Sequence, residues 1–529
     1  MTDAPDRAVQ LRQRAELHAS RREWPQAIAT FGALLAERPD DADVLLQLSY
    51  MESLAGHYRN ARGYALRAAD ARPRSPAIVA ELLARLRTFN EAPALQDCLD
   101  ALGPRREWPI PLLLAAANQL SNLNQQERAL ACLDEASRGD PRFPPTLLAR
   151  AQVLIYLGRF DEAERDLRAC LARAPEIAKT YYLLSRLGVH RGGGSIAPAV
   201  RARLSAPASG ADDAVMLGFA LHAELDRVGD IEGAWEALTG ACAAKRARLR
   251  YDSAESRELV DALMAWTQPA GAVPLQGGPT MATPIFIVGM HRSGTTLLER
   301  LVEGSSQVQG LGELYDFTSQ MRHATDHHCR GVVDARLVQR AAAVAFAAVG
   351  QGYLDGIAWR LGPQRCFTDK LPSNFLNLGF ICAALPHARI LHMHRDPVET
   401  CFSNLRELFS DANPYAYDQH ELAAYYLQYR RLMRHWHQQF PGRIHDVDYA
   451  GLVADPEGTM RGVAEFCGLA FESAMGSVKG RTRAVATASA VSVRDEVARR
   501  EVPKWQPYAA HLRPLRMALA AGGAIPAVD

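Results

Sequence analysis

The segment Pro-Ile-Phe-Ile-Val-Gly-Met-His-Arg-Ser-Gly-Thr-Thr-Leu-Leu-Glu-Arg-Leu-Val-Glu-Gly, residues 284–304, determines the fold predicted for the C-terminal half of the chain. Residues 285–288 form an apolar, β-prone run, and residues 289–294 have a glycine at each end. From residue 295 onward the apolar side chains recur with helical spacing. The segment therefore predicts a strand, a tight loop and a helix in succession.

The loop at 289–294 has the properties of an anion-binding site. Its two glycines let backbone N–H groups point inward, and the following helix adds the positive end of its dipole. The spacing is that of a P-loop, but Thr295 stands where an ATP-hydrolysing enzyme has lysine. Arg292 carries the positive charge instead. We expect the loop to hold phosphate, and a P-loop nucleotide hydrolase or kinase is an alternative function.

The string Arg-Ser-Gly-Thr-Thr-Leu at 292–297 resembles the 5′-phosphosulfate loop of sulfotransferases that use 3′-phosphoadenosine 5′-phosphosulfate (PAPS). It is most similar to the loop of tyrosylprotein sulfotransferases and of bacterial proteins that fuse such a domain to helical repeats. The resemblance implies five donor-binding residues, namely Arg292, Ser293, Gly294, Thr295 and Thr296. Arg292 is implied to be catalytic as well. His291 departs from the pattern, because the family usually has proline there.

Sulfuryl transfer resembles phosphoryl transfer and needs a base for the acceptor and a cation near the transferred group. Glu313 stands 21 residues after Arg292, where the similar enzymes carry their catalytic glutamate. Lys370, in Thr-Asp-Lys-Leu-Pro-Ser-Asn, matches their catalytic lysine. The alternatives are a surface turn at the glutamate and a structural salt bridge at the lysine. The arginines that follow the family's glutamate are replaced here by Leu314, Tyr315 and Asp316, which leaves recognition of an acidic tyrosine peptide open.

The resemblance also implies a site for the rest of the nucleotide. Arg395, at the end of a strand-like run, and Ser403, eight residues later, match the family's 3′-phosphate site. A guanidinium fork suits a phosphate dianion, and the hydroxyl adds a donor. Further matches that bind the donor are Tyr449, Ser489 and Lys504. His392 and His394 alternate on the same run without a third ligand in sequence, so we expect them to pack beside the nucleotide and expect no metal.

The N-terminal half shows only helical periodicity, interrupted at regular intervals. Prolines recur at separations of 34, 68 and 34 residues: Pro39, Pro73, Pro141 and Pro175. A buried-type residue follows the same step: Ala27, Ala61, Leu95, Ala129 and Ala163. This period is typical of tetratricopeptide (TPR) repeats, which stack as helix pairs into a solenoid. The repeat at 74–107 is degenerate, with Asn90 at the turn position. Such a solenoid is either a scaffold or a concave docking surface for a peptide or protein.

Residues 267–283 are rich in proline and glycine, lack periodicity and predict a linker. Beyond it, strand-like runs at 285–288, 365–369, 389–394 and 443–448 alternate with helical segments. The predicted fold class is α plus α/β. It comprises a TPR solenoid over 9–250, a helix and linker over 251–283, and a P-loop-like α/β domain with a parallel sheet over 284–520. We expect the halves to be separable, so that residues 276–529 alone bind the product nucleotide.

Composition restricts the partners. The 529-residue chain has a formal charge of +1, which gives no bulk attraction to nucleic acid or membrane. Its nine cysteines are scattered singly and are expected to be reduced core thiols. No hydrophobic signal core and no run of about 18 apolar residues is present, so we expect a cytoplasmic protein without a membrane span.

Taken together, the sequence predicts a sulfotransferase that moves a sulfuryl group from PAPS to a hydroxyl acceptor. A tyrosine of a peptide or protein docked by the TPR solenoid is one such acceptor. Besides the P-loop hydrolase or kinase, the alternative is a TPR interaction adaptor whose sulfotransferase-like domain is inactive.

Overall fold

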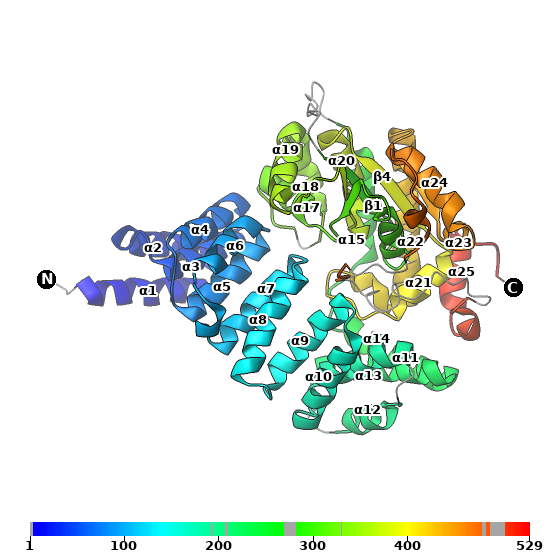
Figure 1. The fold of residues 1–529 in the computed structure, drawn as a ribbon. Helices are drawn as coiled ribbons and strands as arrows, with labels where there is room; N and C mark the ends of the chain where they lie inside the picture. The colour runs from blue at the N-terminus through cyan, green and yellow to red at the C-terminus, as the bar shows by residue number, and fades with distance from the viewer. Residues whose placement is uncertain are drawn as a thin grey trace. The chain divides into compact units, whose positions relative to one another are not determined.

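The computed structural model describes residues 4–191, 194–206, 210–268, 282–329, 331–478, 483–486 and 503–528. An all-helical N-terminal half precedes a region in which helices surround a parallel sheet (Figure 1). The predicted class, α plus α/β, is confirmed.

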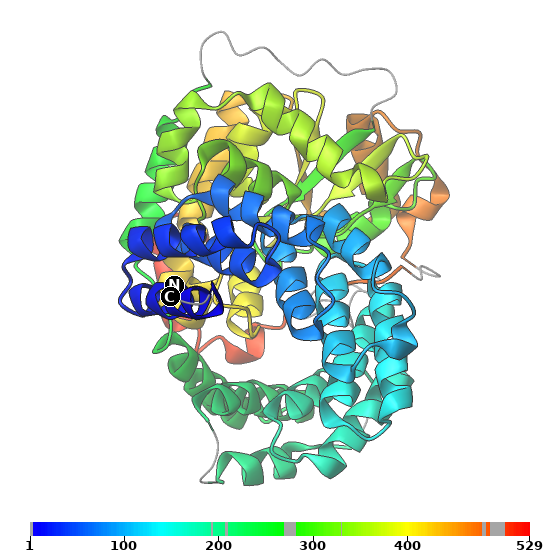
Figure 2. The ribbon, with the colours of Figure 1, turned by 90° about the vertical axis from the view of Figure 1, so that its left-hand side faces the viewer.

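The N-terminal half consists of helices, most of which pack against the next helix in the chain. They are α1 (Ala4–Ser20), α2 (Trp24–Glu37), α3 (Ala42–Ala55), α4 (Tyr58–Asp70), α5 (Pro76–Thr88), α6 (Ala92–Asp100), η1 (Arg105–Glu107), α7 (Ile110–Asn122), α8 (Gln126–Gly139), α9 (Pro144–Leu157), α10 (Phe160–Arg173), α11 (Ala178–Arg191), α12 (Ala197–Leu204), α13 (Ala211–Val228), α14 (Ile231–Arg246) and α15 (Ser253–Ala265). Figure 2 shows α1–α8 lying side by side in chain order. The degenerate repeat is helical, since α5 and α6 occupy it.

One backbone feature recurs at the 34-residue period. The turn after the first helix of each of five pairs contains a residue in a left-handed conformation. These residues are Arg22 (φ 61°), Gly56 (φ 89°), Asn90 (φ 61°), Asn124 (φ 60°) and Gly158 (φ 77°). Glycine and asparagine tolerate this conformation best, so Asn90 performs in the degenerate repeat the turn that Gly56 performs before it. The small-residue positions at 27, 61, 95, 129 and 163 are all fully buried, as close helix packing requires.

The C-terminal half contains five strands, β1 (Thr283–Val288), β2 (Val308–Gly310), β3 (Cys366–Asp369), β4 (Arg389–His394) and β5 (Ile444–Asp448). Their order in the sheet is β2-β3-β1-β4-β5, and every neighbouring pair is parallel. The four strand-like runs of the sequence are confirmed as β1, β3, β4 and β5. The edge strand β2 was not predicted, because three residues are too few to show an alternating pattern.

Helices alternate with the strands along the C-terminal half. They are α16 (Thr295–Val302), α17 (Asp316–Thr325), α18 (Ala335–Arg340), η2 (Ala341–Ala343), α19 (Phe346–Ile357), η3 (Ala358–Arg360), η4 (Pro372–Asn377), α20 (Leu378–Ala384), α21 (Pro397–Leu405), η5 (Pro414–Tyr417), α22 (Gln419–Gln439), α23 (Tyr449–Ala454), α24 (Pro456–Cys467), η6 (Ser473–Gly476), η8 (Gln506–Tyr508) and α25 (Arg513–Ala521). Ile285 and Ile287 of β1 pack with Leu391 of β4 against α16 and α24 in one buried core. The residues between them on β1 and β4 face the other side, where His392 meets Tyr429 of α22.

The chain divides into two compact units. One joins α1–α8 with α17–α19, and the other joins α9–α15 with the sheet and the remaining helices. In the first unit the hydroxyl groups of Tyr58 (α4) and Ser319 (α17) are 3.1 Å apart. In the second unit Asp226 of α13 accepts hydrogen bonds of 2.6 Å from both Arg406 and Tyr508.

Repeat helices and elements of the C-terminal half therefore share each unit, and these contacts argue against the separability expected from the linker. Most of the linker, residues 269–281, lies outside the described residues. The domain boundaries at 9–250, 251–283 and 284–520 stay a prediction.

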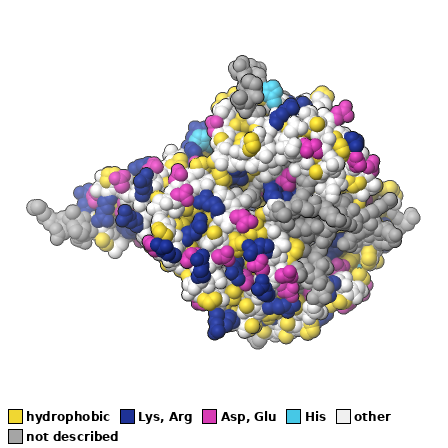
Figure 3. All heavy atoms as spheres, viewed as in Figure 1, with side chains coloured by type: hydrophobic (Ala, Val, Ile, Leu, Met, Phe, Trp, Pro, Cys, Tyr) yellow, Lys and Arg dark blue, Asp and Glu magenta, His cyan; other side chains and the backbone are white. Residues whose placement is uncertain are grey.

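Two surface properties bear on partners. Among the described residues no single helix has the length and apolarity to cross a membrane, although the bent pair Ala335–Ala343 and Phe346–Arg360 passes that test jointly. Figure 3 shows basic and acidic side chains intermixed on the face in view.

The cysteines are core residues, as the sequence predicted. Eight of the nine are buried, and Cys98 is half-buried.

Candidate active site

The loop at 289–294 depends on its two glycines. A Cβ atom on Gly289 would lie 2.4 Å from the carbonyl oxygen of Met393, and one on Gly294 would lie 2.6 Å from Cδ2 of Tyr449. Both residues also have positive φ, 154° and 115°. The N–H of Gly289 donates to Pro372 O at 3.2 Å, which ties the loop to the segment after β3. Only glycine fits these positions, so the loop closes tightly between β1 and α16.

One hydroxyl group of the loop, that of Ser293, is buried. Ser293 is 1% exposed, and its Oγ has no hydrogen-bond partner among the described residues. Thr295 and Thr296 are also buried and form the first turn of α16. Buried polar atoms are nearly always hydrogen-bonded in folded proteins. An orphaned hydroxyl at a helix N-terminus therefore fits an anionic group bound in this loop.

Arg292 has a left-handed backbone (φ 67°), which is uncommon for a residue with a side chain and is typical of functional loops. Its guanidinium lies 3.6 Å from the carboxylate of Glu407, which follows α21. Burial lowers the pKa of Arg292, and Glu407 acts in the opposite direction. The predicted loop cation is thus held inside the site next to a buried carboxylate.

His291, the departure from the family pattern, is packed into the same region. Its ring contacts Phe409 edge-on, and its Nδ1 lies 3.3 Å from the hydroxyl of Tyr415. Burial lowers the pKa of His291 to about 4, with smaller effects from Glu313, Lys370 and Arg292. These effects place His291 within electrostatic reach of all three predicted catalytic residues. Its imidazole is therefore neutral at physiological pH.

Glu313 and Lys370, separated by 57 residues, meet directly. Lys370 Nζ donates to Glu313 Oε1 at 2.5 Å, and Lys370 N–H donates to Gly312 O at 2.9 Å. The lysine side chain is 1% exposed, whereas that of Glu313 is 31% exposed. Lys370 does form a salt bridge, the alternative given for it above, and its partner is Glu313. Because Glu313 is held by this contact, it does not lie on a solvated surface turn.

A buried carboxylate on α16 positions this pair. Glu299 accepts hydrogen bonds from Gly312 N–H at 2.9 Å and from Thr368 Oγ1 at 2.8 Å. Burial alone would raise the pKa of Glu299. The charges of Arg483 and Lys370 and these hydrogen bonds together outweigh burial, so that the pKa of Glu299 is lowered. Glu299 was not predicted from the sequence, because one glutamate beside an apolar helical stripe is typical of a solvated helix face.

Of the predicted 3′-phosphate residues, Arg395 lies between β4 and α21, and Ser403 lies on α21. Arg395 donates to Glu399 at 2.8 Å and lies over the Tyr449 ring, 4.3 Å from its centroid. Ser403 is four residues beyond Glu399 on α21, so the two share a helix face. Trp505 N–H approaches Glu399 at 3.4 Å, which brings the exposed Lys504 to the same neighbourhood. Ser489 lies outside the described residues.

The two histidines of β4 have different surroundings. His392 Nδ1 lies 2.6 Å from Asp446, and His437 Nε2 lies 3.0 Å from the same oxygen. The three residues therefore bring their ligand atoms within 4.8 Å of one another, which supplies the third group that the sequence did not reveal. His394 lies instead 3.6 Å from Asp448. Mutual hydrogen bonds account for the cluster, and the absence of a metal stays a prediction.

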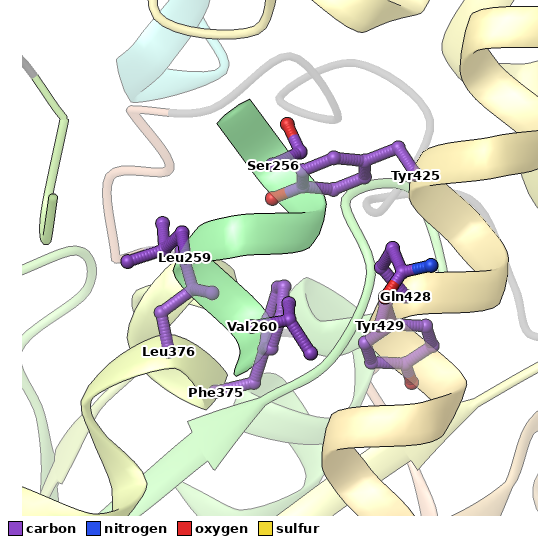
Figure 4. A pocket seen from close by; sticks show the side chains of 8 residues that line it. All are labelled: Ser256, Leu259, Val260, Phe375, Leu376, Tyr425, Gln428 and Tyr429. Carbon is purple, nitrogen blue, oxygen red and sulfur yellow. The ribbon is translucent and has the colours of Figure 1, made fainter. Parts of the chain in front are cut away.

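A pocket drawn in Figure 4 lies between α15, η4 and α22. Uncharged side chains line it, among them Val260, Phe375 and Tyr425. Tyr429 links it to the sheet, because its hydroxyl lies 2.5 Å from His392 Nε2. With no cation in its lining, this pocket does not suit the phosphate or sulfate groups of a nucleotide.

The geometry can be compared with known proteins. Residues 284–473 match the model of the sulfotransferase family. An uncharacterized protein of Aquifex aeolicus is 31% identical over 329 residues, which cover 59% of this chain and 42% of that protein. This chain therefore matches less than half the length of that relative.

Solved structures of both types show weak likeness. The sulfotransferase domain from the curacin biosynthetic pathway is 16% identical, with a TM-score of 0.27, covering 44% of this chain and 98% of that one. A TPR protein from Parabacteroides merdae is 15% identical, with a TM-score of 0.34, covering 45% of this chain and 92% of that one. The support for the family is therefore the match of residues 284–473 to the sulfotransferase family model, in a chain that begins with TPR-like helix pairs.

Proposed function

We propose that the protein transfers the sulfuryl group of PAPS to a hydroxyl group of an acceptor. The observation that carries this proposal is the 2.5 Å contact between Lys370 Nζ and Glu313 Oε1. A base and a cation meet there within electrostatic reach of a glycine-bounded anion loop. This is the arrangement that in-line transfer to a hydroxyl group requires.

In the proposed reaction, the acceptor oxygen forms a bond to sulfur while the bond from sulfur to the oxygen of the 5′-phosphate breaks. Glu313 takes the proton of the acceptor hydroxyl group. Lys370 and Arg292 stabilise the negative charge that develops on the sulfuryl group and on the leaving phosphate oxygen. We assign Glu313, whose side chain is the more exposed, to the acceptor and the buried Lys370 to the donor.

The remaining residues suit the nucleotide product. Ser293 Oγ, orphaned and buried, provides a donor for the 5′-phosphate. Arg395 and Ser403 are assigned to the 3′-phosphate, and Tyr449 and Lys504 to the neighbouring parts of the nucleotide. For the acceptor, we propose a hydroxyl group of a peptide or protein, such as a tyrosine, because TPR-like helix pairs commonly present peptide-docking surfaces.

The first prediction tests the base. Glu313→Gln keeps the size and polarity of the side chain and removes the basic oxygen. We expect this variant to bind 3′-phosphoadenosine 5′-phosphate like the parent in calorimetry. Its rate of transfer should fall by about 10²–10⁴-fold, the usual contribution of a general base. The assay incubates labelled PAPS with cell extract, isolates the labelled acceptor and measures its sulfation by each variant.

Near-parental turnover at neutral pH would shift the base assignment to another group. His291 is the next candidate, because its neutral imidazole can accept a proton. The same assay separates the alternatives from the sequence. A nucleotide hydrolase would consume ATP, and an adaptor with an inactive domain would transfer no sulfate to any acceptor in the extract.

A further inference from the structure

A helix of the repeat half reaches the candidate active site. Arg186 of α11 donates to Glu407 Oε1 at 2.8 Å, and the hydroxyl group of Tyr182, one turn earlier, lies 3.4 Å from the same oxygen. Glu407 is 5% exposed and is also the carboxylate beside Arg292. One buried glutamate therefore links a repeat helix to the loop at 289–294.

The two arginines hold this glutamate unequally. Arg186 lies at hydrogen-bonding distance from Oε1, whereas Arg292 Nη1 lies 3.6 Å from Oε2, beyond a good hydrogen bond. Burial alone would lower the pKa of Arg186, but the charge of Glu407, the neighbouring Tyr182 and the hydrogen bonds to both together outweigh burial and raise that pKa. The strong pair is thus Arg186–Glu407, and Arg292 is the looser partner.

This inequality matters because a buried carboxylate must be neutralised. Without Arg186, Glu407 would depend on Arg292, and the loop cation would be held by protein instead of by an anionic ligand. With Arg186 in place, Arg292 can turn toward a phosphate or sulfate group while Glu407 keeps a charged partner.

We propose, resting on the sulfotransferase function proposed above, that Arg186 is a positioning residue of the repeat half that neutralises Glu407 and so leaves Arg292 available to the sulfate donor. The donor site is then incomplete without α11. This role also gives a reason for the packing of repeat helices against C-terminal helices in one unit, where Arg246 of α14 forms a further ion pair with Glu421 of α22 through hydrogen bonds of 2.6 and 2.7 Å.

The test compares two arginine variants of the full chain. Arg186→Gln removes the charge that neutralises Glu407. Arg150→Gln breaks a matched pair inside the repeats, because Arg150–Asp166 has side-chain exposures of 26% and 8% against 26% and 7% for Arg186–Glu407. Both variants should lower the thermal midpoint similarly. Only Arg186→Gln should weaken the binding of 3′-phosphoadenosine 5′-phosphate. We expect calorimetry to show a loss of affinity of about tenfold or more, the effect of one charged hydrogen bond.

A second pair of variants separates positioning from structural damage. Removing the carboxylate with Glu407→Gln should make Arg186 dispensable, so Arg186→Gln/Glu407→Gln should regain most of the affinity lost by Arg186→Gln alone. Arg186→Lys should lose less affinity than Arg186→Gln, because it keeps the charge. Should Arg186→Gln not fold, the Arg186→Lys and double variants carry the comparison.

The outcomes distinguish this inference from the function on which it rests. If the parent chain binds no 3′-phosphoadenosine 5′-phosphate, the proposed function and the inference fall together. If the parent binds it and Arg186→Gln binds equally well, the inference alone is overturned. The inference alone is also overturned if Arg186→Gln/Glu407→Gln binds the nucleotide as weakly as Arg186→Gln does.

Discussion

The two ends of the candidate nucleotide site are built differently. At the transfer end, defined by Glu313 and Lys370, the lysine side chain is 1% exposed and its backbone is hydrogen-bonded to Gly312. At the 3′-phosphate end, defined by Arg395 and Ser403, the arginine side chain is 21% exposed and shared between Glu399 and the Tyr449 ring. A reacting group needs fixed geometry, whereas a phosphate that only binds can be held by an adjustable side chain.

The largest effect is expected at the transfer end. Lys370→Ala should lower the rate of sulfate transfer by about 10²-fold or more, because it removes a preorganised charge from a buried site. Nucleotide affinity should change much less. Turnover with labelled PAPS and calorimetry with 3′-phosphoadenosine 5′-phosphate measure the two effects.

Lys245→Ala is the control for that prediction, because Lys245 also forms an ion pair, at 2.7 Å from Asp411, but is not among the predicted site residues. A Lys370→Ala variant that loses affinity and rate equally would mean that the lysine only binds the donor, and the contrast between the two ends would disappear.

An intermediate effect is expected at Arg395. Arg395→Ala should lower the affinity for 3′-phosphoadenosine 5′-phosphate by about ten- to a hundredfold, the contribution of a charged hydrogen bond. Adenosine 5′-phosphosulfate, which lacks the 3′-phosphate, should be affected far less. Calorimetry with both nucleotides checks this, and equal weakening would remove Arg395 from the 3′-phosphate site.

The sequence predicted the parts of this site that short segments determine. The glycine loop, the strand ends that carry Lys370 and Arg395, and the helix that carries Ser403 each follow from local pattern. The resemblance placed Glu313, which the structure brings to Lys370. In the repeats, the 34-residue step identified the turns, including the one at Asn90.

Sequence reasoning missed the carboxylates that organise these residues. Glu299 and Glu407 are buried, yet a glutamate on or after a helix usually faces solvent. Arg186 lies 221 positions from Glu407 in a half that shows only repeat periodicity, so no spacing rule connects them. The packing of repeat helices against helices of the C-terminal half was hidden for the same reason, and the linker composition suggested independence instead.

The smallest effect is expected at Ser403, and it tests whether the 3′-phosphate end is adjustable. Ser403 is half-buried on the face of α21 that also carries Glu399, the partner of Arg395. Water readily replaces a neutral hydroxyl group at such a position. Ser403→Ala should therefore lower the affinity for 3′-phosphoadenosine 5′-phosphate by only about two- to tenfold. Adenosine 5′-phosphosulfate serves again as the control ligand. In Arg395→Ala/Ser403→Ala the losses should be less than additive, because both residues act on one phosphate. A loss at Ser403 larger than at Arg395 would mean that the hydroxyl group fixes the phosphate rigidly, and the two ends of the site would then follow the same design.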